Sequence, residues 1–444
     1  MRLLSSRTNG LPARAFRSFK SQFSQITPRS KAVLAFLLLY LIAIQVCRVT
    51  FYRDPTSWFF NPKVAYNQRY STVRREQADA FIEGAATNVS HRNGDSSPKL
   101  CVGVASVARE SQRYFRTSVG SLLEGLTPEE RQGVYLVLFI AHTEPTQHPA
   151  YSEKWLHNVA DRVLMYNLAE DELDHIRQLE ADRGLFREKA LFDYTYLLKA
   201  CAAVGAPYIV MVEDDVIALD GWYHRTLKAI ESAEAQTHER GVAEFLYLRL
   251  FYTEEFLGWN SEDWATYLFW SLVTVLIPIA GWMAFRQFHP PLKRIIPIWM
   301  IVLVTGVFMP MFILLFFAIG RVSTLPIPSG VNEMSNFGCC SQSFVFPQHK
   351  AIELTNYYES KRIGFVDMLT EELADKNHEL RWALTPSVMQ HVGRKSSKGD
   401  DYGSTSKYNM TVAEKLWNFS FERNDPKALH EEHLREAEIS NTDG

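Results

Sequence analysis

The chain has 444 residues, with 47 Lys and Arg against 50 Asp and Glu, which gives a formal net charge of −3. Hydrophobic residues make up 47% and aromatic residues 13%, which excludes a disordered protein, a collagen-like chain and a small disulfide scaffold. The near-neutral charge argues against a nucleic-acid binder held by phosphate attraction. The length suits one large domain or two to three ordinary ones.

The N-terminal segment has the composition of a membrane anchor. Residues 1–31 contain seven Lys and Arg and no Asp or Glu, and the uninterrupted apolar run Ala32–Ile44 follows them. This run is longer than a signal-peptide core, and no small-residue cleavage site comes after it. We therefore predict a cytosolic basic tail over 1–31 and an uncleaved transmembrane signal anchor over 32–49. A cleaved signal peptide is the alternative.

Two further apolar runs lie in the middle of the chain, Trp264–Phe285 and Ile295–Gly320, and each is long enough to span a bilayer. The connection 286–294 between them carries one Lys and two Arg, which places it in the cytosol. We therefore predict a transmembrane hairpin over 264–320, with the chain on both sides of the hairpin in the lumen.

Two observations fit a luminal placement. Three N-glycosylation sequons, at Asn88, Asn409 and Asn418, fall in the predicted luminal segments. Cysteines in those segments are able to form disulfides. They allow three pairings, among which the sequence does not choose: Cys101, Cys201, Cys339 and Cys340.

From Leu100 onward the chain alternates apolar strand patterns with amphipathic helix patterns, and the clearest strands are Leu100–Val107, Val134–Ile140 and Tyr208–Val212. This alternation predicts an α/β domain with a mostly parallel sheet, whose ligands bind at the carboxyl ends of the strands. We predict a luminal stem, a domain whose first part binds nucleotide and metal and whose second part faces the acceptor, and a luminal C-terminal tail. The stem is expected over 50–99 and the tail over 396–444. The first part of the domain is expected over 100–263 and its second part over 321–395.

The central chemical feature is Glu213-Asp214-Asp215, which directly follows an apolar strand. Clustered carboxylates at the end of a strand suit a hard divalent cation, which neutralises the diphosphate leaving group of a sugar nucleotide. A solvated acidic turn is the alternative. His391 is a candidate to complete a manganese shell of carboxylate and phosphate oxygens, although a lone histidine also serves as a structural residue.

Basic residues lie where a nucleotide would bind. Arg187 and Lys189, near the start of the helix before the acidic strand, are placed to contact a base or a diphosphate. Lys189 and Asp193 are four residues apart, so a surface ion pair explains them equally well. Arg109 follows the first strand at its carboxyl end, and an ordinary charged loop is the alternative there.

The order of these motifs resembles the N-acetylglucosaminyltransferase IV family. That family has an R-x-K-x-x-x-D-Y helix, matched here by 187–194, and a strand that ends in Glu-Asp-Asp, matched by 208–215. Its later Gln-His-Val-Gly, followed by Ser-Ser, matches Gln390–Gly393 with Ser396-Ser397, with a slightly different spacing after the glycine. The ordered combination is specific, although each motif alone is weak.

The resemblance implies a GT-A glycosyltransferase domain, with Mn²⁺ held by Asp215 and His391. It also implies a set of residues that bind the UDP-sugar: Val107, Arg109, Arg187, Lys189, Asp193, Glu213, Asp214 and Asp215.

The predicted hairpin departs from that family, whose members have a single anchor. A GT-A domain split by tandem membrane helices instead resembles the family of Golgi post-GPI-attachment N-acetylgalactosaminyltransferases. That resemblance implies a UDP-GalNAc donor, Mn²⁺, and transfer to the first mannose of the GPI core on a GPI-anchored protein. It also implies a multi-pass Golgi membrane protein whose catalytic domain is luminal and lies beside the bilayer.

A β-linked product made from an α-linked UDP-sugar requires inversion, which needs one general base and no covalent nucleophile. We expect the base after the hairpin, near the acceptor, where Asp367, Glu371 and Glu372 are candidates and Asp367 is favoured. A solvated acidic helix face explains the same three residues.

Two other functions compete with this interpretation. One is a UDP-GlcNAc-dependent N-glycan branching transferase, which needs no docking at a bilayer. The other is a non-enzymatic multi-pass membrane protein, which the ordered set of motifs disfavours. The sequence does not choose between GalNAc and GlcNAc, because that choice depends on contacts around one hydroxyl group.

Overall fold

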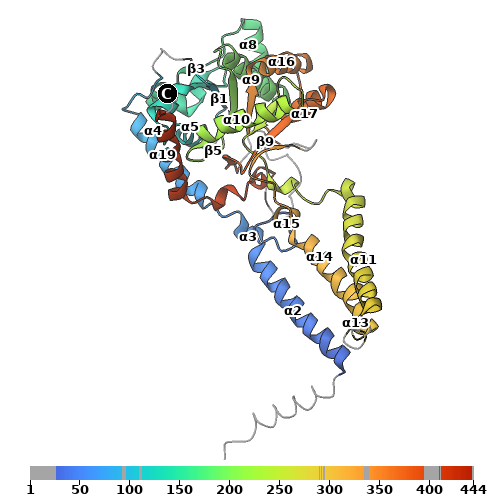
Figure 1. Ribbon diagram of the computed structural model, residues 1–444. Coiled ribbons are helices and arrows are strands. Elements are labelled where there is room, and N and C mark those ends of the chain that lie inside the picture. The colour runs from blue at the N-terminus through green and yellow to red at the C-terminus, as the bar shows by residue number, and fades with distance from the viewer. Residues whose placement is uncertain are drawn as a thin grey trace, which may run out of the picture. The chain divides into compact units, whose positions relative to one another are not determined.

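The computed structural model describes residues 27–92, 97–109, 113–289, 291, 293, 296–334, 340–394, 410 and 412–442 (Figure 1). The chain divides into two compact units. The helical unit comprises Met1–Phe60 and Trp259–Thr324, and the α/β unit comprises Asn61–Gly258 and Leu325–Gly444. Segments that precede and follow the mid-chain apolar helices therefore fold into one α/β unit.

Three helices in the described part of the chain are long and apolar enough to cross a membrane, as predicted: Pro28–Thr50, Glu254–Phe288 and Ile298–Ile319. The first is α2, and the apolar part of the second is α11 (Trp264–Phe288). Many of their large apolar side chains are exposed, including Leu39 at 63% and Trp270 at 61%. Such faces are stable in a lipid environment.

The third span is built from α13 (Ile298–Leu303), a π-helical turn η6 (Val304–Phe308) and α14 (Met309–Ile319). It packs against α2 through aromatic rings, because Phe36 stacks on Phe308 with 3.7 Å between ring centroids. The Tyr40 hydroxyl donates to the Met311 carbonyl at 2.9 Å. These contacts hold the N-terminal helix and the third span together.

The α/β unit is built on one eight-stranded mixed sheet, in the order β3-β2-β1-β4-β8-β6-β9-β7. Its first four strands are parallel, and β8 then pairs antiparallel with both β4 and β6. The sheet is therefore mixed: six of its eight strands run in one direction, as predicted for a mostly parallel sheet, whereas β8 and β7, both from the segment after the apolar helices, run in the opposite direction. The strands are β1 (Leu100–Ser106), β2 (Val134–Ile140), β3 (Arg162–Leu164), β4 (Tyr208–Glu213), β6 (Tyr247–Arg249), β7 (Gly330–Glu333), β8 (Ser343–Pro347) and β9 (Arg381–Thr385).

Helices cover both faces of this sheet (Figure 1). Both faces of β1 are covered, which explains why its sequence is a continuous apolar run and does not alternate between apolar and polar residues. The principal helices are α5 (Tyr114–Leu123), α9 (Phe186–Ala202), α10 (Trp222–Glu239), α16 (Gln348–Lys361) and α17 (Val366–Asn377).

A disulfide between Cys101 and Cys201 fixes β1 to α9, with 5.6 Å between the two Cα atoms. Gly103 permits this close approach, because a Cβ atom there would lie 3.1 Å from Leu197 Cγ. Cys340 is also disulfide-bonded, whereas Cys339 lies outside the described residues.

A two-stranded antiparallel sheet joins β5 (Val216–Ala218) to β10 (Met389–His391), with His391 opposite Val216. β5 begins directly after the acidic triplet. The pairing therefore brings a histidine from near the end of the α/β unit beside carboxylates at the end of β4.

The predicted stem is wrong over α4 (Tyr70–Ala85), which belongs to the α/β unit. Its Tyr70 and Ile82 are in the core, at 1% and 0% exposure. Arg74 is also fully buried, where its Nε donates to the Ala218 carbonyl at 3.1 Å. The polar composition concealed this packing, because the apolar stripe of α4 is narrow and its buried arginine is fully hydrogen-bonded.

The prediction of a separate C-terminal tail over 396–444 is also wrong over its described part, because this segment contributes Phe421 and Leu429 to the core. Asn418 is fully buried, and its Nδ2 donates to the Tyr252 carbonyl at 3.1 Å. A glycan does not fit at an enclosed amide, so Asn418 is not an acceptor in this fold. Asn88 is exposed, and Asn409 lies outside the described residues.

Candidate active site

The acidic triplet lies at the carboxyl edge of the parallel strands, as its position after an apolar strand predicted. Glu213 is the last residue of β4 and pairs in register with Ala105 of β1. Asp214 and Asp215 form the turn into β5 and are only 5% and 6% exposed. The alternative of a solvated acidic turn is wrong for these two residues.

Arg109 is the cation that faces these carboxylates. Its Nη2 lies 2.6 Å from Asp214 Oδ1 and 3.6 Å from Asp215 Oδ2. Burial and the charge of Asp215 raise the pKa of Asp214, the charge of Arg109 lowers it, and the net result is a pKa of about 6. One guanidinium therefore faces two buried aspartates, and Glu213 adds to their negative field. A divalent cation would compensate the remaining negative charge.

His391 lies on the other side of Asp215, with 3.5 Å between its Nε2 and Asp215 Oδ2. Its Nδ1 is 3.2 Å from the Leu416 carbonyl, which only accepts, so Nδ1 carries a proton. This leaves Nε2 facing Asp215. Burial lowers the His391 pKa, but the charge of Asp215 and a hydrogen bond to it outweigh burial, so that the pKa is raised overall.

Gly393 leaves space between these two residues. A Cβ atom at this position would lie 2.8 Å from His391 Nε2 and 2.9 Å from Asp215 Cγ, and nearer still to Asp215 Oδ2. The backbone holds the arrangement, because Val392 N donates to the Asp215 carbonyl at 2.9 Å. A carboxylate oxygen and an oriented imidazole nitrogen that share an open space fit a manganese ion.

Sequence reasoning missed two residues that hold Asp214. Ser106 Oγ donates to Asp214 Oδ2 at 2.6 Å, and His148 Nε2 lies 3.0 Å from Ser106 Oγ. His148 Nδ1 accepts from Ala150 N at 3.2 Å, so Nε2 is the donor to Ser106. Ser106 ends β1, so the carboxyl-edge rule could have found it. His148 lies in a loop without any sequence signal.

A small pocket opens beside these residues, lined by Ser106, Arg109, Tyr114, His148 and Asp214 among others. Its cavity volume, as the described residues form it, is about 30 Å³. Small-molecule sites are usually on the order of 300–1,000 Å³. A ligand as large as a nucleotide sugar would therefore require side chains such as Arg109 to move.

Val107 and Arg109 line this pocket, whereas the basic residues of α9 do not. Lys189 and Asp193 are a buried ion pair with 2.7 Å between Nζ and Oδ2, so the surface-pair alternative is wrong. Lys189 Nζ also donates to the Ala141 carbonyl at 3.0 Å and to the Tyr166 hydroxyl at 2.8 Å. Because Ala141 and Tyr166 follow β2 and β3, this pair fixes the loops at the carboxyl edge.

Arg187 is exposed, and its guanidinium lies 4.7 Å from the centre of the Phe365 ring. Phe365 immediately precedes α17. The structure thus places Arg187 against the part of the chain expected to face the acceptor, and it records no contact between Arg187 and the acidic triplet among the described residues.

Two of the three candidate bases, Glu371 and Glu372, form ion pairs with basic side chains. Glu371 accepts from Tyr247, Arg249 and Arg381, at 2.6, 2.8 and 2.8 Å. Glu372 is an exposed carboxylate 2.8 Å from Lys361 Nζ, and the hydrogen bond with Lys361 lowers its pKa. Carboxylates held in this way are poor proton acceptors, so neither fits the role of base.

Asp367 is in the first turn of α17, where its Oδ1 accepts from Met368 N at 2.9 Å. Within the described residues it makes no ion pair, which distinguishes it from the other two candidates.

Comparison with known proteins gives two findings. A family model described as "GPI-N-acetylgalactosamine transferase PGAP4" matches residues 100–390. Curated relatives include alpha-1,3-mannosyl-glycoprotein 4-beta-N-acetylglucosaminyltransferase C of Macaca fascicularis, 28% identical over 165 residues, or 34% of each chain. The B enzyme of Danio rerio is 26% identical over 149 residues, which cover 29% of this chain and 26% of the relative. The match thus spans about a third or less of these relatives.

Proposed function

The chain belongs to the GPI-N-acetylgalactosamine transferase PGAP4 family, and from this premise we propose that it transfers GalNAc from UDP-GalNAc to the first mannose of the GPI-anchor core. The observation that carries the proposal is the family match over 100–390, a range that includes the acidic triplet and ends within β10. The parallel strands β3-β2-β1-β4, with carboxylates at their carboxyl edge, support a nucleotide-binding GT-A domain.

The residues of the chain would divide the work as follows. Asp215 and His391 would hold the metal ion, while Ser106 would keep Asp214 oriented. When bound, Mn²⁺ supplies positive charge to the diphosphate leaving group. Arg109 exchanges its contacts with the aspartates for contacts with the donor. A diphosphate suits this exchange, because a guanidinium binds carboxylate and phosphate with similar geometry.

Inversion requires a base on the acceptor side of the sugar. We assign this role to Asp367, because Glu371 and Glu372 are neutralised by cationic partners. Asp367 comes from the same segment as Phe365, on which Arg187 stacks. An acceptor bound there would meet both a carboxylate and a cation.

The three candidate spans support an enzyme that is integral to a membrane and acts on a lipid-anchored acceptor. We propose that it is a multi-pass protein of the Golgi membrane with the α/β unit in the lumen. The basic N-terminal segment and the exposed sequon at Asn88 are consistent with that orientation.

A second candidate function is transfer of GlcNAc from UDP-GlcNAc to N-glycans. The curated relatives favour it, since they are named as mannosyl-glycoprotein N-acetylglucosaminyltransferases. Its donor differs from UDP-GalNAc by the configuration at one hydroxyl group.

The test uses full-length protein purified in detergent, a GPI mannose-core acceptor and an N-glycan acceptor, with UDP-GalNAc or UDP-GlcNAc as donor. We expect manganese-dependent transfer of GalNAc to the GPI acceptor, lost in Asp215→Asn. The matched control is Asp171→Asn, an exposed carboxylate on α8 (Glu170–Ala181), which should leave transfer unchanged. Transfer of GlcNAc to the N-glycan instead would overturn the proposal in favour of the second candidate.

A further inference from the structure

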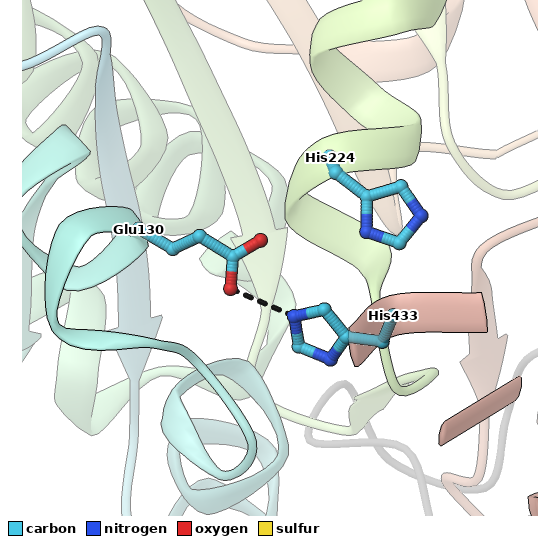
Figure 2. A group of neighbouring side chains, drawn as sticks. All are labelled: Glu130, His224 and His433. Atoms are coloured by element: carbon cyan, nitrogen blue, oxygen red, sulfur yellow. Dashed lines mark hydrogen bonds and ion pairs between the residues drawn. The ribbon is translucent and has the colours of Figure 1, made fainter. Parts of the chain in front are cut away.

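A second cluster of metal-ligand side chains lies where three helices meet (Figure 2). It contains Glu130 from α6 (Pro128–Gly133), His224 from α10 and His433 from α19 (Pro426–Thr442). One ligand atom from each residue lies within 4.8 Å of the other two. None of the three residues belongs to the proposed catalytic machinery.

His433 is clamped between two carboxylates. Its Nε2 lies 2.7 Å from Glu130 Oε2, and its Nδ1 lies 2.5 Å from Asp220 Oδ1. Asp220 Oδ2 is in turn 3.0 Å from His430 Nδ1. The side chain of His433 is only 3% exposed, so the two carboxylates dominate its surroundings.

Burial lowers the pKa of His433, but hydrogen bonds to Asp220 and Glu130 outweigh it and raise the pKa to about 9. In this arrangement the protonated His433 ring supplies the positive charge between the carboxylates of Asp220 and Glu130. The Nε2 proton of His433 lies between His433 Nε2 and Glu130 Oε2. Imidazole nitrogens and carboxylate oxygens of this kind are zinc ligands in other proteins.

His224 has the opposite character. Its side chain is 11% exposed, and within the described chain neither of its ring nitrogens makes a hydrogen bond. The nearest acidic atom, Glu432 Oε1, is 3.7 Å from Nε2. Burial and the neighbouring His433 lower the pKa of His224, so its ring is neutral at physiological pH. Its ring centroid is 5.4 Å from that of His433, and the two ring planes are tilted by 37°. Figure 2 shows the two side chains as neighbours.

A buried neutral imidazole without a hydrogen bond is costly, because a polar group taken out of water normally requires a partner. A metal ion would supply that partner. The other two ligands are already oriented by contacts of their own: Thr127 N donates to Glu130 Oε2 at 3.0 Å in a capping box, and Asp220 holds the Nδ1 proton of His433. A carboxylate that fixes the second nitrogen of a histidine ligand is a recurring feature of zinc sites.

We propose that Glu130, His224 and His433 bind a Zn²⁺ ion that fastens the C-terminal helix α19 to α6 and α10. The ion replaces the Nε2 proton of His433, and this proton is released to solvent. The Nδ1–H group of His433 continues to donate its hydrogen bond to Asp220. Glu130 supplies a carboxylate oxygen, His224 supplies a ring nitrogen, and a water completes the tetrahedron.

Zinc binding requires side-chain movement, and the largest is at His224: its ligand atom now lies within 4.8 Å of the other two and must approach them by up to about 1.5 Å. Zinc bonds to nitrogen and oxygen are about 2.0–2.1 Å, so neighbouring ligand atoms of a tetrahedron lie roughly 3.3 Å apart. The Glu130 and His433 atoms are now 2.7 Å apart and must separate by about half an ångström to reach that distance. Two imidazoles favour zinc over manganese, which prefers oxygen ligands.

The test measures metal content and does not depend on transferase activity. Full-length protein in detergent is stripped with a chelator, incubated with Zn²⁺, desalted, and analysed by mass spectrometry for bound zinc. Wild type and Asp215→Asn should retain one zinc per chain at this site. His224→Ala should lose it, and Asp220→Asn should weaken the affinity about 10- to 100-fold. His349→Ala, with a side chain 77% exposed, is the matched control and should retain it.

Misfolding is separated from loss of the site by thermal unfolding. His224→Ala removes buried packing as well as the proposed ligand, so some loss of melting temperature is expected even without metal. Zinc should raise the melting temperature of wild type and leave that of His224→Ala unchanged. Co²⁺ should give the absorption of a tetrahedral complex in wild type and not in His224→Ala. Failure of the wild type to retain zinc, or equal retention by His224→Ala and wild type, would overturn the proposal.

Discussion

Gly393→Ala tests whether Asp215 and His391 act together at one open space. The added Cβ would lie 2.8 Å from His391 Nε2 and 2.9 Å from Asp215 Cγ, whereas ordinary contacts begin at 3.4 Å. Both side chains must therefore move by about half an ångström or more. Catalytic groups need to be held to roughly that tolerance, and a 1 Å error costs about 100-fold, so we expect transfer to fall about 10- to 100-fold.

The assay is kcat/KM for sugar transfer at several manganese concentrations, with the melting temperature measured beside it. We expect the manganese dependence to shift to higher concentration while the fold remains intact. The control is Gly84→Ala, because a Cβ atom there has nothing within 4 Å. If Gly393→Ala kept wild-type transfer and manganese dependence, the assignment of Asp215 and His391 as joint ligands would be wrong.

Three further predictions concern other parts of the chain. Glu371→Ala leaves Arg249 buried without its carboxylate and should lower the free energy of unfolding by about 3–5 kcal/mol in urea titration; a loss below about 1 kcal/mol would contradict a structural role. Because folding raises the pKa of His433 to about 9, its contribution to stability in chelator should be complete below about pH 6.5 and lost as pH rises through 9. Melting temperature against pH checks this, and His433→Gln should remove that loss. In cells, Asn88→Gln should remove one glycan and increase electrophoretic mobility, whereas Asn418→Gln should not; a mobility change in the second variant would show that Asn418 is accessible.

Features that depend only on neighbouring residues could be predicted from the amino-acid sequence. Hydropathy alone located the three candidate spans, because crossing a bilayer requires about 20 consecutive apolar residues. The place of the acidic triplet at the end of a buried strand was predicted for the same kind of reason, since the strand before it is a continuous apolar run. These patterns are local, so they are visible without a fold.

Tertiary structure decided which of the candidates meet. His391 reaches Asp215 only because β10 pairs with β5, and Glu371 is removed as a base by arginines on β6 and β9. The core packing of α4 and of the described C-terminal segment had no clear signal, because their apolar residues are sparse. Contacts between distant segments leave no periodic pattern in either one, so Glu130, His224 and His433 become a cluster only once the three helices have folded together.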